Sequence, residues 1–471
     1  MTAPHQRLRI AVLVVALASV ASCADQKPPA SPSLTPPAGT TSPSSGPSNP
    51  DASSQTAVPP SAAPPAEPAP LGWIRAGKIP EGGSASSVLS FADGYVAWGT
   101  QGDEIDAAAW FSADGQAWRQ VDFGEQPTCL GSGPSIVTAV AAPSGVLLIT
   151  NEPDASLAGC GWHLVAWTTT NGTTWQASRL SDATGQGGVV AWWTSGAYEA
   201  IVRDSRGAGR LWRSDDGSTW TINHEIDFIS ELDSITGTAD AVGTRLLSVS
   251  TGDIDPVTGA LYASKDGGTW ARVSEPGTDA DVIDGLTPPG DGHSFWVATT
   301  TDQETPRQTI WVSSDLKNWT AGALGFEAAG VIVPTSHGLL ALGHDVCIDT
   351  GTACELRPRE YLLSRDGLDW RPLGTMDVAE VFADGPAGVV GVDAIGSAVW
   401  RLERLTEDEV FLVAGLRPDV RGRCAPRRDG LPARAVAGVT CRPSAGGVDE
   451  VGAYLFERAG DLQAAYRDRM A

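Results

Sequence analysis

The sequence predicts an all-β fold, a β-propeller with seven blades, and three observations predict it. A seven-residue phrase recurs six times between residues 112 and 370, and its closing tryptophans lie 45 to 57 residues apart. Short strand-like segments separated by Gly- and Asp-rich turns surround each copy. No long helical periodicity occurs between Trp73 and Leu402. A repeat of about 40–50 residues is typical of propeller blades.

The phrase begins with Ser or Thr and ends with Trp, and each copy is predicted to be a tight turn between two strands. The third residue can fold its side-chain oxygen onto nearby backbone amides, and the fourth, usually Gly, supplies a positive φ. Two copies depart from the pattern, with Asn171 in place of Asp and Leu316 in place of Gly. The residues with predicted structural roles are Asp114, Asn171, Asp216, Asp266, Asp315 and Asp366, with Trp118, Trp175, Trp220, Trp270, Trp319 and Trp370.

These six copies resemble the Asp-box of sialidase-type β-propellers, S-x-D-G-x-x-W, and the resemblance covers residues 73 to 402. It implies that each copy fastens the outer edge of a blade and does not itself bind ligand. It also implies that an active sialidase would need three arginines, a Tyr–Glu pair and an Asp. Tyr198 and Glu199 are neighbours on a predicted strand, so their side chains point to opposite faces. Tyr95, Tyr198, Tyr262 and Tyr361 all fall at predicted packing positions.

The two ends of the repeat region are predicted to meet in one blade. Trp73-Ile74-Arg75 resembles a fourth strand without its first three, and residues 379–402 resemble three strands without a fourth. Joining them closes the ring over residues 71–402 and gives seven blades; six and eight are the alternatives.

The N-terminal residues predict export and a lipid anchor. Residues 1–22 have a basic start followed by a short apolar run, which is typical of a signal peptide. The ending Val20-Ala21-Ser22-Cys23 resembles a bacterial lipobox and implies acylation of Cys23; an ordinary cleaved signal is the alternative. Residues 28–70 contain 14 Pro and 9 Ser, so residues 23–70 are predicted to be a disordered stalk on the extracytoplasmic face of the cell membrane.

Six cysteines remain after Cys23, an even number that suggests disulfides in an exported protein. Their positions favour the pairs Cys129–Cys160, Cys347–Cys354 and Cys424–Cys441. A metal site is the rival interpretation, but the sequence has no Cys or His spacing typical of one.

Topology places the loops between the second and third strands of each blade on the face opposite the repeated phrase. These loops are acidic, and we expect them to form a binding face. The candidate residues are Asp103, Glu104, Asp106, Asp204, Asp253, Asp255, Asp302, Glu304 and Asp345, with Glu152, Asp154, Asp349, Glu355 and Asp393 in equivalent segments. Asp253 and Asp255 could hold Ca²⁺ through oxygen ligands; otherwise no cofactor or metal is expected.

The net charge of −24 argues against a nucleic-acid partner, because phosphates require a positive surface. A basic partner would be attracted, although acidity also keeps an exposed protein soluble.

Residues 403–471 predict a small α/β module with the order helix, strand, strand, helix, stapled by Cys424–Cys441. The predicted segments are 407–416, 435–441, 451–456 and 459–469. A basic cluster lies beside them and could dock on the propeller, bind anionic lipid or remain solvated. It comprises Arg417, Arg421, Arg423, Arg427, Arg428 and Arg434.

Taken together, these features predict a monomeric, membrane-anchored propeller that binds an envelope protein or a glycan without catalysis. A sialidase-like exo-glycosidase is the alternative.

Overall fold

The structure is a computed structural model that describes residues 70–467 with gaps. The residues outside the description are 1–69, 81, 102–105, 125–132, 155–160, 182–188, 204–207, 227–233, 252–257, 278–280, 291–292, 303–307, 323–327, 345–359, 376–380, 394–397, 417–423, 429, 442–450, 457–460, 462, 466 and 468–471. No helix among the described residues is long and apolar enough to cross a membrane.

The described strands form seven four-stranded antiparallel sheets and one three-stranded sheet. Sheets 1 to 3 are β2 (Gly83–Phe91), β3 (Gly94–Gln101), β4 (Asp106–Ser112) and β5 (Arg119–Gln120); β6 (Ser135–Ala142), β7 (Gly145–Asp154), β8 (Gly161–Thr169) and β9 (Gln176–Ser181); and β10 (Val189–Thr194), β11 (Ala197–Arg203), β12 (Gly209–Ser214) and β13 (Thr221–Ile226).

Sheets 4 to 6 follow the same strand order. They are β14 (Ser234–Ala239), β15 (Arg245–Thr251), β16 (Thr258–Ser264) and β17 (Ala271–Arg272); β18 (Asp281–Thr287), β19 (Trp296–Asp302), β20 (Gln308–Ser313) and β21 (Thr320–Ala321); and β22 (Ala328–Thr335), β23 (Gly338–His344), β24 (Glu360–Ser364) and β25 (Arg371–Thr375).

Sheet 7 closes the ring with strands from both ends of the repeat region. β26 (Val381–Gly385), β27 (Gly388–Val392) and β28 (Ala398–Arg404) are completed by β1 (Leu71–Lys78) as the outermost strand. Trp73 lies opposite Leu402 and Arg75 opposite Trp400, which confirms the predicted meeting of the two ends.

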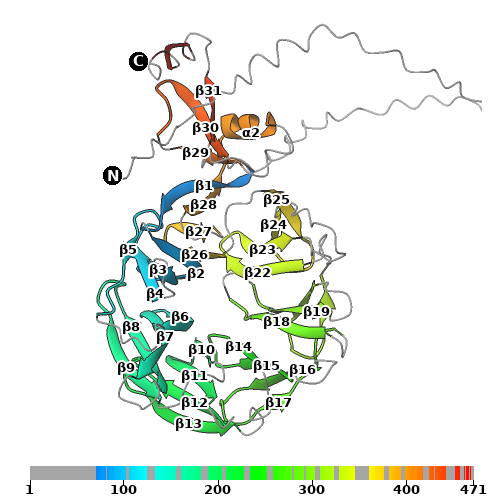
Figure 1. Ribbon diagram of the computed structural model, residues 1–471. Helices are drawn as coiled ribbons and strands as arrows, with labels where there is room; N and C mark the ends of the chain where they lie inside the picture. The colour runs from blue at the N-terminus through cyan, green and yellow to red at the C-terminus, as the bar shows by residue number, and fades with distance from the viewer. Residues whose placement is uncertain are drawn as a thin grey trace, which may run out of the picture.

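The sheets stand around a common centre, as Figure 1 shows. The first strand of each sheet contacts the first strand of the next, from β2 through β6, β10, β14, β18, β22 and β26 back to β2. The predicted β-propeller is therefore confirmed. Each sheet packs between two others, so its second strand is buried on both faces. Val146, Leu147, Leu148 and Ile149 are consecutive in β7 and all fully buried, as expected for a strand covered on both sides.

The C-terminal module lies outside the ring, next to the closing sheet (Figure 1). Helix α2 (Glu407–Ala414) precedes a three-stranded sheet of β29 (Cys424–Arg427), β30 (Ala435–Cys441) and β31 (Val451–Phe456). The predicted order of helix, strand, strand, helix was therefore wrong by one strand. β29 was missed because it is only four residues long and contains Pro426, which weakens the sequence signal for a strand. Residues 461, 463–465 and 467, in the segment predicted as the closing helix, are helical.

Candidate functional site: the two faces of the ring

The face that carries the repeated phrase is formed by self-contained turns, which we call the heptapeptide turns. In all six, the side-chain oxygen of Asp or Asn accepts hydrogen bonds from the amides two and three residues on, over 2.7–3.0 Å. These donors hold the pKa of Asp216, Asp266 and Asp315 well below the ordinary carboxyl value. Each carboxylate is therefore engaged by its own turn.

The closing tryptophan makes an indole hydrogen bond in five of the six copies, whereas the buried Nε1 of Trp118 has no partner. In four copies its indole Nε1 donates to the carbonyl of the turn glycine, as Trp220 does to Gly217 over 2.9 Å. Trp319 donates instead to the Ser274 carbonyl, over 2.9 Å. Its turn contains Leu316, which keeps the left-handed backbone that glycine adopts in the other copies, with φ 59°. The turn geometry is thus retained without its glycine.

The opposite face carries the loops between second and third strands, which we call the loop face. Because every four-stranded sheet runs in the same antiparallel order, the end of each second strand and the start of each third strand lie on this side. These strand pairs are β3–β4, β7–β8, β11–β12, β15–β16, β19–β20, β23–β24 and β27–β28. The expected binding residues Asp103, Glu104, Asp204, Asp253, Asp255, Glu304 and Asp345 belong to these loops and lie outside the described residues. Asp106 begins β4 and Asp302 ends β19, where only the backbone is described.

Three other acids of the loop face have described side chains, and each is engaged within the protein. Glu152 is buried, and its Oε1 accepts hydrogen bonds from Trp167 Nε1 over 2.9 Å and from Thr150 Oγ1 over 2.7 Å. Asp154 lies 3.6 Å from Arg179. Asp393 is buried and accepts the Ala398 amide across its own loop, over 3.3 Å. Because Glu152 and Asp393 are buried, the expectation that they line a binding surface was wrong for these two. For Asp154, which is partly exposed, it stays a prediction.

The four propeller tyrosines that could have supplied the nucleophile of a sialidase-like mechanism have packing roles, as the sequence predicted. Tyr95, Tyr198 and Tyr361 are buried, and Tyr262 is half-buried. The Tyr95 hydroxyl donates to the Gly388 carbonyl over 2.5 Å and accepts the Ala387 amide over 3.0 Å. Burial raises the pKa of Tyr95 and of Tyr198 to about 12. Phenols held protonated in this way are poor nucleophiles.

Sequence reasoning missed a buried ion cluster between sheets 3 and 4. Glu199 of β11 is fully buried, and both its oxygens accept from the guanidinium of Arg245 in β15, over 2.6 and 2.7 Å. Arg213 Nη1 donates to it over 2.8 Å and Trp192 Nε1 over 3.0 Å. Burial alone would raise the pKa of Glu199, but these donors hold it below the ordinary value. A charged residue within the apolar run Ala197–Val202 was the available signal.

The chemistry of this cluster is structural. Arg245 uses its remaining Nη1 donors on the carbonyls of Gly243 and Lys265, over 2.7 and 2.8 Å, so it also secures the heptapeptide turn of sheet 4. Tyr198, the neighbour of Glu199, packs in a different core between sheets 2 and 3. The two side chains therefore face opposite sides of the sheet, as predicted. Among the described residues, no group of three or more His, Cys, Asp or Glu could hold a metal ion.

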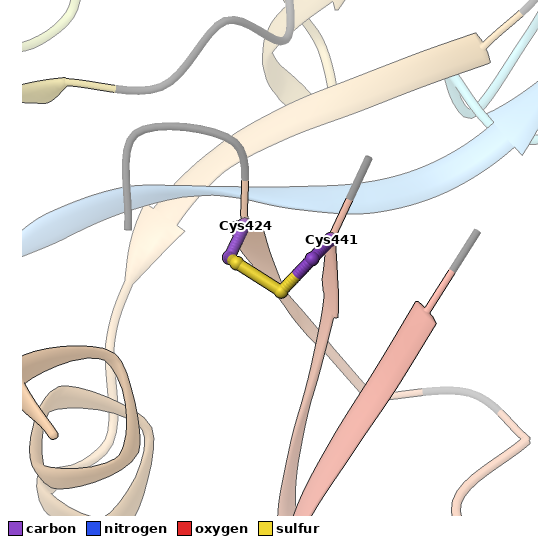
Figure 2. The surroundings of a disulfide bond; sticks show 2 residues. All are labelled: Cys424 and Cys441. Atoms are coloured by element: carbon purple, nitrogen blue, oxygen red, sulfur yellow. A yellow bond between two sulfur atoms is a disulfide. The ribbon is translucent and has the colours of Figure 1, made fainter. Parts of the chain in front are cut away.

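Of the predicted disulfides, Cys424–Cys441 is present, with an S–S distance of 2.04 Å between residues opposite each other on β29 and β30 (Figure 2). Cys129, Cys160, Cys347 and Cys354 lie outside the described residues, as does Cys23.

No protein-family model and no curated protein matches this chain. Solved structures with a similar arrangement include the GH74 xyloglucanase from Xanthomonas campestris, with 18% identity and a TM-score of 0.45, covering 79% of this chain and 60% of that one. The BP39L lectin from Burkholderia pseudomallei has 11% identity and a TM-score of 0.44, covering 72% and 98%.

The Trypanosoma rangeli sialidase has 13% identity and a TM-score of 0.36, covering 59% of this chain and 56% of that one. This chain therefore spans less than two thirds of the length of the xyloglucanase and of the sialidase. The similarity concerns the propeller architecture, which the strand order described above establishes independently.

Proposed function

We propose that this protein is an exported, lipid-anchored β-propeller that binds a protein or glycan ligand on its loop face and does not catalyse a reaction. The observation that carries the proposal is the contrast between the two faces. One is closed by heptapeptide turns whose carboxylates serve their own backbones. The other gathers seven loops, one from each sheet, and most of the acidic candidates lie in them. Loops on a rigid scaffold are where binding residues concentrate.

The proposal includes the role of the repeated phrase. We take the heptapeptide turns to be Asp-boxes of the sialidase type, acting as fasteners. The hydrogen bonds that consume the Asp or Asn oxygen in all six copies support this role. The anchor part of the proposal is supported by the sequence alone, from the apolar leader, Cys23 and the Pro-rich segment that follows.

Binding is tested by removing charge from the loop face. The full chain, immobilised, is probed with a glycan array and with an envelope extract, and bound components are identified by mass spectrometry. The fourfold variant Asp253→Asn, Asp255→Asn, Asp302→Asn and Glu304→Gln should lose the captured ligand. The control variant Asp215→Asn and Asp369→Asn removes exposed acids from the heptapeptide turns and should keep it. Equal capture by both variants would contradict the loop face as the binding site.

Catalysis and anchoring are tested separately. Incubation of the full chain with fluorogenic sialosides and xyloglucan oligosaccharides should give no turnover, whereas steady hydrolysis would favour the enzyme alternative. For the anchor, metabolic labelling with an alkyne fatty acid should mark the native protein, and Cys23→Ala should abolish the label. A label that survives this substitution would contradict lipidation at Cys23.

A further inference from the structure

The outer edge of the closing sheet is covered by the C-terminal module. β1 is the outermost strand of sheet 7, so one of its edges pairs with no strand of that sheet. β29 of the module contacts β1 (Figure 1). An outermost strand presents unpaired backbone groups, and proteins commonly protect such edges with another element. β1 differs from the other outer strands because it alone joins the ring from the opposite end of the repeat region.

Apolar contacts join the module to β1. Ala425 of β29 is fully buried in the same core as Trp73 of β1 and Leu402 of β28. Leu405, just after β28, packs over Gly72 so closely that a Cβ there would lie 2.8 Å from its methyl groups. The Leu405 amide also donates to the Pro70 carbonyl over 2.8 Å, which extends the pairing of β1 beyond its first residue.

Arg428 is the polar link between the module and the ring. Its guanidinium donates to both carboxylate oxygens of Glu409 over 2.8 and 2.9 Å, to the Arg404 carbonyl over 2.8 Å, and to Glu403 at the end of β28. Glu409 also accepts the Thr406 amide over 2.8 Å and so completes the N-terminal cap of α2. One arginine therefore joins β29, the start of α2 and the last residues of the closing sheet.

The disulfide holds β29 within the module. Cys424 and Cys441 are both buried, in a core with Leu412 of α2, Val439 of β30 and Ala453 of β31. Figure 2 shows the bond between the two neighbouring strands, with β1 passing beside β29. Because β29 is only four residues long, its own ladder is short, and the covalent bond to β30 keeps it in position against β1.

We propose that the C-terminal module is an intramolecular clamp that holds β1 in the closing sheet and so keeps the ring closed. The module docks on the edge of β1 through Ala425 and Leu405, and Arg428 fixes its orientation on Glu403 and Glu409. This assigns the module a role within the chain, independent of any ligand on the loop face.

Hydrogen–deuterium exchange of the full chain, followed by mass spectrometry of peptides, tests the clamp. In Arg428→Ala, the amides of β1 should exchange about tenfold faster, because the population of locally open molecules rises exponentially as local stability falls. Amides of β10 to β13, on the far side of the ring, should keep their rates. Arg434→Ala is the matched control, since it removes an arginine that pairs with Asp461 within the module, over 3.1 Å.

A stronger variant prevents an ambiguous result. Arg428→Ala combined with Cys424→Ala and Cys441→Ala removes both the link and the staple, and β1 should then lose more protection than with Arg428→Ala alone. Unchanged exchange of β1 in this triple variant would overturn the proposal. An equal rise in all seven sheets would also overturn it, because the module would then act on overall stability and not on closure.

Discussion

Two kinds of contact join neighbouring sheets at the same place in the ring. In sheets 1 to 6, one residue of the second strand lies opposite the first position of the heptapeptide turn, and Val389 is its equivalent in sheet 7. At each interface this residue meets a second-strand residue of the preceding sheet, one position further along that strand. In six interfaces this pair is apolar and shares one core; the pairs are Val96–Val146, Leu147–Tyr198, Leu246–Trp296, Val297–Leu339, Leu340–Val389 and Val390–Tyr95. Between sheets 3 and 4 the pair is Glu199–Arg245.

The same place in the ring is therefore filled by an apolar pair at six interfaces and by an ion pair at the seventh. An apolar pair requires only that its two side chains fill the space between the sheets. The Glu199 carboxylate instead accepts four hydrogen bonds, and each of them needs a donor at a fixed position. Buried ion pairs contribute little net stability, but breaking one leaves a costly unpaired charge. Glu199 and Arg245 therefore depend on each other, whereas each apolar pair contributes through the burial of its own side chains.

The largest expected effect comes from breaking the ion pair. Glu199→Gln should lower the free energy of unfolding by about 3–5 kcal/mol, because Arg245, with a side chain 3% exposed, would keep its charge without a counter-charge. Leu147→Ala, at the equivalent position of sheet 2, should cost about 2–5 kcal/mol through a cavity alone. Chemical denaturation measures both. A loss below about 1 kcal/mol for Glu199→Gln would contradict the importance of the charge.

A smaller loss of stability is expected from a substitution next to Leu316, the native residue that stands at the glycine position of its turn. In all five other turns a Cβ on the glycine would crowd a side chain of the preceding sheet. In three of them that side chain belongs to the residue just before the repeated phrase, as Phe111 does for Gly172 and Val312 for Gly367. The equivalent of Phe111 and Val312 before Leu316 is Ala263, and both residues belong to the same core. Ala263→Val should therefore cost about 1–3 kcal/mol by overpacking.

Ala263→Val should cost less stability in a Leu316→Gly background, because the space that the Leu316 side chain fills is then free. A double-mutant cycle on denaturation midpoints measures this coupling. Additive losses would show that Ala263 and Leu316 do not compensate each other.

Replacing the ion pair by an apolar pair should cost about 1–3 kcal/mol, because no buried charge is left unpaired but Trp192 Nε1 and the carbonyls of Gly243 and Lys265 lose their partners. Glu199→Leu with Arg245→Tyr reproduces the Leu147–Tyr198 pair of the preceding interface. Either single substitution alone should be more destabilising than both together. If the double variant were the least stable of the three, the two interface chemistries would not be equivalent.

The smallest effect concerns the heptapeptide turns and depends on pH. Hydrogen bonds from the amides of Asp369 and Leu368 lower the pKa of Asp366, so its stabilising contribution is present above the ordinary carboxyl value and is lost as pH falls through the lowered one. Asp366→Asn should keep the turn at pH 7, since Asn171 makes the same bonds over 2.8 and 2.9 Å.

Between pH 5 and pH 2 the melting temperature of Asp366→Asn should fall less steeply than that of the native chain. Asp369→Asn is the control, because Asp369 serves this turn through its backbone amide. If the melting temperatures of the native chain and of Asp366→Asn fell equally with pH, the role of the lowered pKa would be contradicted.

The repeated features of this molecule could be predicted, and its single features could not. Asp216 and Trp220 mark a turn because their counterparts recur at blade spacing, and this periodicity also located β1 beside β28. Glu199 and Arg245 could not be paired from the sequence, since the contact joins different sheets 46 residues apart. Glu152 was taken for a surface acid because its burial depends on Trp167 from the neighbouring strand. Candidate binding acids such as Asp253 lie outside the described residues, so their arrangement stays a prediction.

The closing sheet has a consequence for the order in which the chain folds. β1 is the first strand of the ring to be synthesised, yet its partner β28 begins at Ala398, more than 300 residues later. Contacts between such distant segments form slowly, because the intervening chain must first be organised. Sheets 1 to 6 draw their strands from consecutive residues and can assemble as they emerge. Trp73 must wait for all of them, so completion of the ring should be the slowest step of folding.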